Sequence, residues 1–194
     1  MMNFDRRQLL AMLPALALAR PDSALTLAAP NEPFQKQLDM FWPLFMSLPN
    51  VREPARDADA RDICFMFTNK SCSICKSVHR AYRSGFAKLE MRFVVYPWPG
   101  DDNRELNYLY RRETSFADLD AYMMGKPVPL TASNSPDLPD QILMAGRHIA
   151  EELIEGGGFG TPFFLYAAGA ATNGPVTYTA GDIGAVQDMF DKAV

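Results

Sequence analysis

The first half of the chain contains two apolar runs separated by a more polar segment. The nearly continuous run at Ile63–Phe67 is typical of a strand buried on both faces. A helix is expected to follow from Cys72 to about Leu89, with Ser71 as its N-cap residue. The run at Met91–Tyr96 predicts the next strand, which the following prolines would end. Strand, helix and strand in this order predict a parallel pair with a crossover.

The second half of the chain predicts a helical block followed by a hairpin. Residues 102–155 are mostly helical in character. Three helices are expected there, at Asp102–Arg112, Ser115–Met124 and about Pro139–Glu155. The runs at Pro162–Ala167 and Val176–Thr179 predict antiparallel edge strands, and Asp182 can cap a final amphipathic helix. The fold class is therefore α/β, with a mixed central sheet flanked by helices.

The segment before the first strand has a helical periodicity of its own. Between Phe34 and Leu48, apolar residues recur at spacings of four and three, with a kink expected at Pro43. We expect this helix to pack on the domain, and a partner-binding or dimerising face is the alternative. The chain then divides into a leader helix and connector at 20–61 and one domain at 62–194.

Residues 1–19 have the layout of a bacterial signal peptide. Arg6 and Arg7 form the positive part, and Leu9–Ala19 is an uncharged apolar run that is too short for a permanent membrane anchor. The paired arginines resemble a twin-arginine signal, and a Sec signal is the alternative. We expect an exported protein that is not inserted in a membrane after cleavage.

Composition and charge exclude some functional classes. The chain has 194 residues, of which 48% are hydrophobic and 22% are charged, as in ordinary globular proteins. Its formal net charge is −4, so it lacks the basic footprint of a nucleic-acid-binding protein. No nucleic-acid partner is expected.

The three cysteines separate into the close pair Cys72 and Cys75 and the single residue Cys64. A cysteine pair with this spacing at the first turn of a helix can close a small disulfide ring. The helix N-terminus stabilises negative charge, so the pKa of the Cys72 thiol should lie below that of a free cysteine. We therefore expect Cys72 to attack a substrate disulfide and Cys75, which is more shielded, to resolve the mixed disulfide.

The cysteine pair has two other interpretations. A zinc site would need two more ligands from Cys64, His79 and His148, yet the chain has no second C-x-x-C. An inert structural disulfide is disfavoured because strand, CxxC and helix in this order form the redox context. No metal or other cofactor is expected besides the redox-active cysteine pair itself.

The domain resembles a known family in several segments. These are CFMFTNKSCSICKSVHRAY, then FVVYPWPG, a helical block, and GGGFGTPFFLYAAG. Together they are similar to the catalytic domain of the DsbC/DsbG thiol–disulfide interchange proteins of the thioredoxin superfamily, over residues 62–194. The resemblance implies a thioredoxin-like fold with a helical insertion, at about 102–155, before the strand that carries the cis-proline.

The resemblance also implies the roles of the site residues. It assigns catalysis to Cys72 and Cys75, and it identifies Pro162 as the cis-proline beside the sulfurs, with Thr161 in contact with the pair. The dipeptide Ser73-Ile74 between the cysteines would tune the redox poise.

The function implied is a periplasmic disulfide isomerase or reductase that acts on exported proteins. A membrane electron donor of the DsbD type would keep Cys72 and Cys75 reduced. The alternatives are a DsbA-like net oxidant and a non-enzymatic protein, either a copper binder using Cys72, Cys75 and His79 or a thioredoxin-like adaptor. Residues 20–61 are short for the dimerisation domain of DsbC and DsbG, so the oligomeric state stays open.

Three further residues have a structural and a functional interpretation, and a fourth, Met66, departs from the family pattern. Cys64 is expected to be a small core residue rather than a regulatory thiol. His79 lies on the same helix face as Cys75, and we expect a surface position or a core hydrogen bond there. Lys70 could stabilise the Cys72 thiolate, although an exposed loop lysine is the default. Met66 stands where thioredoxins carry a buried acid.

Overall fold

The computed structural model describes several stretches of the chain. They are residues 42–53, 62–83, 89–111, 114–131, 138–153, 159–167 and 176–180. The predicted signal peptide at 1–19, the leader before residue 42 and the predicted final helix from Asp182 lie outside these residues. Within the described stretches, no helix is long and apolar enough to cross a lipid bilayer.

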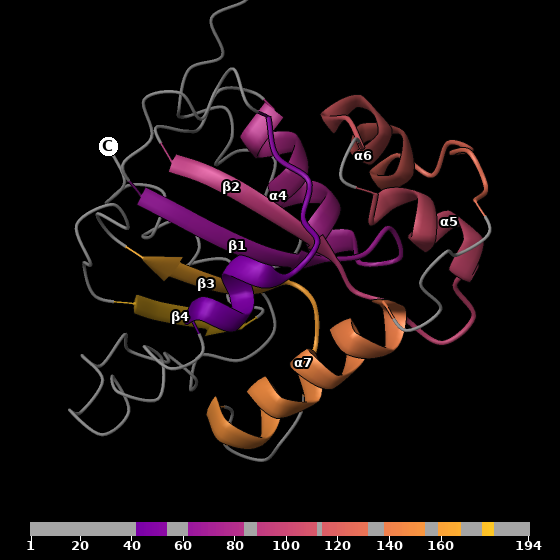
Figure 1. Ribbon diagram of the computed structural model, residues 1–194. Coiled ribbons are helices and arrows are strands. Elements are labelled where there is room, and N and C mark those ends of the chain that lie inside the picture. Colours follow the sequence, from indigo (N-terminus) through magenta and orange to yellow (C-terminus); the bar gives the residue numbers. More distant parts are fainter. Residues whose placement is uncertain are drawn as a thin grey trace, which may run out of the picture.

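The centre of the fold is a mixed four-stranded sheet in the order β2-β1-β3-β4 (Figure 1). β1 (Asp62–Thr68) and β2 (Leu89–Val95) are parallel and are joined by α4 (Ser73–Arg83). β3 (Phe163–Ala167) pairs antiparallel with β1 and with β4 (Val176–Ala180). The predicted parallel pair and antiparallel hairpin are therefore confirmed.

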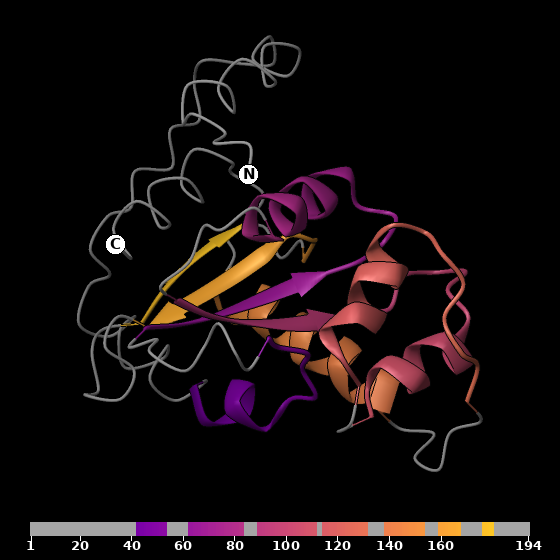
Figure 2. The ribbon, with the colours of Figure 1, turned by 90° about the horizontal axis from the view of Figure 1, so that it is seen from above.

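β1 is the centre of the core because both of its faces are covered. Every side chain from Cys64 to Thr68 is fully buried. Successive side chains of a strand point to opposite faces, so this burial requires a layer on each side. Figure 2 shows α4 on one side of the sheet, and the short helix at 42–47 and α7 (Leu138–Leu153) on the other.

The helix at 42–47 packs its aromatic residues on β1. The ring centroid of Phe45 lies 5.7 Å from those of Phe65 and Phe67, and Trp42 lies 5.5 Å from Phe65. Phe45 has no exposed surface, which makes it part of the core. In the part that the structure describes, the apolar stripe thus packs on the domain, as expected.

α4 covers the other face and ends earlier than predicted. Its His79 and Tyr82 rings both lie 5.4 Å from the ring of Phe93 on β2. The helix ends at Arg83 rather than near Leu89, because Leu89 pairs with Asp62 as the first residue of β2.

The predicted helical insertion lies between β2 and β3. It contains α5 (Asn103–Leu109), α6 (Phe116–Met123) and α7, and Figure 1 shows α5 and α6 at one end of the sheet. Asp102 caps α5, and Ser115 caps α6 in a capping box, so each helix begins one residue after the start expected from the sequence. The fold is thus the expected thioredoxin-like arrangement with a helical insertion before β3.

A glycine allows α7 to approach the segment that leads into β3. A Cβ atom at Gly146 would lie 2.5 Å from the Tyr96 ring and 3.1 Å from the Phe159 ring. The ring centroids of Tyr96 and Phe159 are 4.8 Å apart. Because Phe159 lies two residues before Thr161, this packing helps to place the start of β3.

Candidate active site

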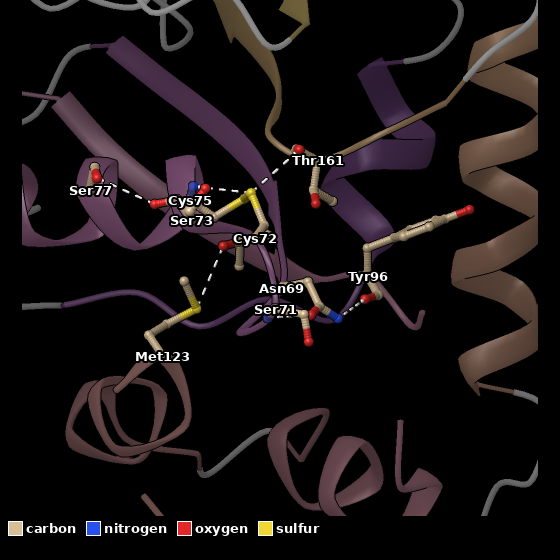
Figure 3. Close-up of a disulfide and its surroundings, with 10 residues drawn as sticks. Asn69, Ser71, Cys72, Ser73, Cys75, Ser77, Tyr96, Met123 and Thr161 are labelled. Carbon is tan, nitrogen blue, oxygen red and sulfur yellow. Dashed lines mark hydrogen bonds between the residues drawn. A yellow bond between two sulfur atoms is a disulfide. The ribbon is translucent and has the colours of Figure 1, made fainter. Parts of the chain in front are cut away.

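Cys72 and Cys75 form a disulfide at the start of α4 (Figure 3). Their Cα atoms are 5.2 Å apart, within the range that a disulfide requires. Cys72 retains 6% of its surface exposed, whereas Cys75 retains none. Of the two cysteines, Cys72 is thus the one that an incoming group can reach.

The first turn of α4 begins one residue later than predicted. The Lys76 N–H donates to the Cys72 carbonyl at 3.2 Å, so Cys72 and not Ser71 occupies the N-cap position. The Ser71 N–H donates instead to the side chain of Asn69 at 2.8 Å, which places Ser71 in the preceding turn. The Cys75 N–H donates to Cys72 Sγ at 3.0 Å, so the sulfur accepts the bond that an N-cap oxygen usually accepts.

The segment before β3 lies against the disulfide. The Thr161–Pro162 peptide bond is cis, and the Thr161 carbonyl oxygen lies 3.4 Å from Cys72 Sγ (Figure 3). Because Phe67 pairs with Phe163 in antiparallel strands, the last residues of β1 and the first residues of β3 lie at the same end of the sheet. Thr161 Oγ1 is buried and has no hydrogen-bond partner among the described residues.

The dipeptide between the cysteines has one exposed and one half-buried residue. Ser73 is exposed, and its carbonyl oxygen accepts a hydrogen bond from Ser77 Oγ at 3.2 Å. Ile74 is half-buried and packs against the core. Their influence on the redox poise stays a prediction.

The sequence interpretation missed how the loop before Cys72 is held. Asn69 is fully buried, and Lys70 forms an ion pair with Glu105 while its Nζ lies 5.0 Å from the ring centroid of Tyr122. Lys70 is therefore half-buried and paired, and not the exposed loop lysine that the sequence favours. A signal for Asn69 was available, since asparagine side chains commonly bond to the backbone of the same turn.

The remaining sulfur, Cys64, is a core residue, as expected. Its side chain is fully buried in β1, and burial raises the pKa of its thiol. Met66 in the same strand is also fully buried. Cys64 is therefore poorly suited to exchange chemistry in the folded protein.

His79 is held by the helical insertion. It is 2% exposed, and its Nε2 lies 2.6 Å from Asp120 Oδ1. Burial lowers the pKa of His79, and the Asp120 carboxylate opposes this effect. The expected core hydrogen bond is thus present, and its Nε2 is engaged by Asp120.

An open cleft of about 460 Å³ lies between α4 and α6. It is lined by His79, Arg80, Arg83, Ala117, Asp120, Ala121, Met124 and Lys126. The cysteine pair does not line it. In the described parts of the chain, no group of three or more histidine, cysteine or acidic side chains could hold a metal ion.

No family model matches the chain, and no curated protein matches it. Several solved structures are similar to it at low identity. A disulfide interchange protein from Neisseria gonorrhoeae is 15% identical, with a TM-score of 0.49 over 75% of this chain and 95% of that chain. The catalytic domain of Proteus mirabilis ScsC is 16% identical, with a TM-score of 0.48 over 82% and 98%.

A third solved structure is the thiol-disulfide exchange protein alpha-DsbA2 from Wolbachia pipientis. It is 17% identical, with a TM-score of 0.49 over 86% of this chain and 99% of that chain. At this level of similarity, the chemistry of the site has to be inferred from the geometry of this chain.

Proposed function

We propose that the protein is a thiol–disulfide oxidoreductase that works through Cys72 and Cys75. The observation that carries the proposal is the disulfide at the N-terminus of α4, placed against the cis Thr161–Pro162 bond. A disulfide with a purely structural role does not require a helix N-terminus next to one of its sulfur atoms. It also does not require that one cysteine be more exposed than the other.

The local electrostatics favour Cys72 as the nucleophile. In the reduced state, the Cys75 N–H and the N-terminal end of the α4 dipole stabilise a thiolate at Cys72 Sγ. Cys75 has no exposed surface, so a substrate disulfide reaches Cys72 first. Cys75 remains one helical turn away, in reach for the second step.

The exchange then proceeds in two balanced steps. The Cys72 thiolate attacks one sulfur of a substrate disulfide, that bond breaks, and the other substrate sulfur leaves as a thiolate. Cys75 loses its proton and attacks Cys72 Sγ, which releases the first substrate sulfur as a thiolate. The substrate gains two electrons, and the protein is left with the Cys72–Cys75 disulfide. The reverse sequence oxidises a substrate dithiol.

We further propose that the substrates are exported proteins in a periplasm and that the net activity is isomerisation or reduction. The signal-like residues 1–19 and the resemblance to the DsbC/DsbG catalytic domain support this choice. Such an activity needs a membrane donor of the DsbD type to return electrons to the pair. A DsbA-like net oxidant is the competing subtype. The dipeptide Ser73-Ile74 is that of neither strong oxidants nor thioredoxin, so it does not decide between the two directions of electron flow.

The experiment that tests the division of roles is the trapping of mixed disulfides. The Cys75→Ser variant should retain a covalent complex with a disulfide-containing polypeptide, because Cys72 can attack but nothing resolves the intermediate. The Cys72→Ser variant should trap none and should lose exchange activity. Cys64→Ala is the matched control and should behave like the unaltered protein.

Equal trapping by Cys72→Ser and Cys75→Ser would overturn the assigned roles. Full exchange activity in Cys72→Ser would overturn the function itself.

A further inference from the structure

Asn69 is a fully buried polar residue in the loop between β1 and Cys72. Both ends of its amide are engaged (Figure 3). Oδ1 accepts from the Ser71 N–H at 2.8 Å, and Nδ2 donates to the Tyr96 carbonyl and to Asp101 Oδ2, each at 2.8 Å. A buried amide with both ends paired is held in one orientation.

The same residue also holds the helix start through its backbone. The Cys72 N–H donates to the Asn69 carbonyl oxygen at 3.1 Å. Asn69 therefore bonds to two successive N–H groups, those of Ser71 by its side chain and of Cys72 by its main chain. These bonds set the direction in which the chain enters α4, and thereby the position of the Cys72 sulfur at the first turn.

Asp101 fixes the other side of this contact. Its Oδ2 accepts from the Trp98 N–H at 2.7 Å in addition to the bond from Asn69. The next residue, Asp102, is the N-cap of α5 and makes no hydrogen bond to the loop among the described residues. Asn69 thus joins the cysteine loop to the segment that connects β2 with α5.

The residues on either side of Asn69 in the chain contact the same insertion. Thr68 Oγ1 lies 3.6 Å from Met123 Sδ at the end of α6. Lys70 on the other side pairs with Glu105 of α5. Three successive residues, the last of β1 and the first two of the loop, therefore contact the helical insertion or the segment leading into it, and the central one is Asn69.

We propose that Asn69 is a positioning residue for disulfide exchange, which holds Cys72 Sγ at the N-terminal N–H groups of α4 through its bonds to Ser71 and Asp101. The inference rests on the proposed function of Cys72 and Cys75. Without the Asn69 amide, the Cys72 sulfur is held less firmly beside the Cys75 N–H, and the thiolate is less stabilised.

The test uses the reduced full chain and follows alkylation of Cys72 by iodoacetamide across a pH series, resolved by residue with mass spectrometry. Asn69→Ala and Asp101→Ala should slow alkylation of Cys72 at neutral pH about threefold and move the curve to higher pH. Asp102→Ala is the matched control. It should lower the thermal midpoint by uncapping α5 and leave the alkylation curve in place.

A reciprocal exchange of side chains separates positioning from stability. Asn69→Asp keeps the acceptor for the Ser71 N–H but sets a second carboxylate against Asp101, so it should slow Cys72 alkylation. Adding Asp101→Asn restores the donor–acceptor pair between positions 69 and 101 with the partners exchanged. The Tyr96 carbonyl still lacks its donor, so the double variant should recover part of the rate. This pair of variants also carries the test if Asn69→Ala does not fold.

Two results would overturn the inference. One is an unchanged alkylation curve in Asn69→Ala despite a lower thermal midpoint, which would make Asn69 a structural residue only. The other is a double variant no faster than Asn69→Asp. Exchange with oxidised glutathione is measured alongside. If the unaltered protein shows no exchange while the alkylation curves shift as expected, the proposed function fails and the positioning of Cys72 stands.

Discussion

The two ends of α4 meet their surroundings in different ways. At the first turn, Cys72 Sγ lies beside backbone groups, the Cys75 N–H at 3.0 Å and the Thr161 carbonyl at 3.4 Å. Toward the last turn, His79 packs its ring 5.4 Å from Phe93, and its Nε2 lies 2.6 Å from Asp120. The first turn of α4 therefore places a sulfur next to main-chain groups, whereas the later part of the helix packs a side chain, His79, into the core.

This difference indicates how chemistry and stability are divided along the helix. The neighbours of Cys72 Sγ at the first turn are main-chain groups, which the fold of the backbone holds in place. The contacts toward the last turn bury aromatic surface, which is the larger source of folding free energy. The two ends should therefore respond independently to substitution, and the following variants test this independence.

The largest loss of folding stability is expected from a substitution in the aromatic core against which the later turns of α4 pack. Phe93 is fully buried between the rings of His79, Tyr82 and Phe116. Phe93→Ala should lower the free energy of unfolding by about 3–5 kcal/mol, measured by chemical denaturation. The reduction potential of the cysteine pair in the folded fraction should not change. A shift of more than about 30 mV would contradict the separation of the two ends.

An intermediate effect is expected where the cysteine loop meets α5. Lys70→Met removes the partner of Glu105, whose side chain is only 11% exposed. The unpaired carboxylate should lower the free energy of unfolding by about 1–2 kcal/mol. Arg104→Met, which breaks an exposed ion pair with Asp102 in the same helix, is the control and should cause no measurable loss. Equal effects in both variants would contradict the importance of burial at this contact.

A smaller effect is expected for the third sulfur. Cys64→Ala removes one buried atom from β1 and should lower the free energy of unfolding by about 1 kcal/mol. In the reduced folded protein, Cys64 should react with iodoacetamide far more slowly than Cys72, because burial raises the pKa of its thiol. Comparable alkylation rates for the two thiols would refute the assignment of Cys64 to the core.

The smallest effect is a pH dependence that originates at His79. In the folded state, burial lowers the pKa of His79 below its ordinary value of 6.5. As the pH falls below the unfolded-state pKa of 6.5, His79 is protonated in the unfolded chain but not yet in the folded protein. The free energy of unfolding therefore declines from its value above pH 6.5, until the pH has fallen past the lower folded-state pKa. His79→Gln should flatten the stability profile between pH 7 and pH 5, measured by denaturation at each pH. An unchanged slope would assign the effect to other groups.

Much of the fold could be predicted because local patterns determine it. The continuous apolar run at Ile63–Phe67 can only be accommodated with layers on both sides, and the structure supplies them. The helices expected from Asp102 and Ser115 begin one residue later, because each of these residues is the N-cap. The disulfide could also be predicted from the spacing of Cys72 and Cys75, because residues three apart lie within one helical turn.

The side-chain pairs that hold the site could not be predicted in the same way. Asn69 and Asp101 are 32 residues apart, and His79 and Asp120 are 41 apart. Neither pair belongs to one periodic element, so hydrophobic patterning contains no information about their approach. The N-cap was misplaced at Ser71 for the same reason, because the Asn69 side chain that decides the turn is itself held by Asp101.

The most direct test of the central claim is the redox equilibrium of the purified protein in graded glutathione buffers, read by thiol trapping and mass. We predict one reversible two-electron couple that belongs to Cys72 and Cys75, is absent in Cys72→Ser and is retained in Cys64→Ala. A potential of about −120 to −200 mV would support an oxidant or isomerase, and one of about −270 mV would support a reductant. The absence of a reversible couple would contradict a function in thiol–disulfide exchange.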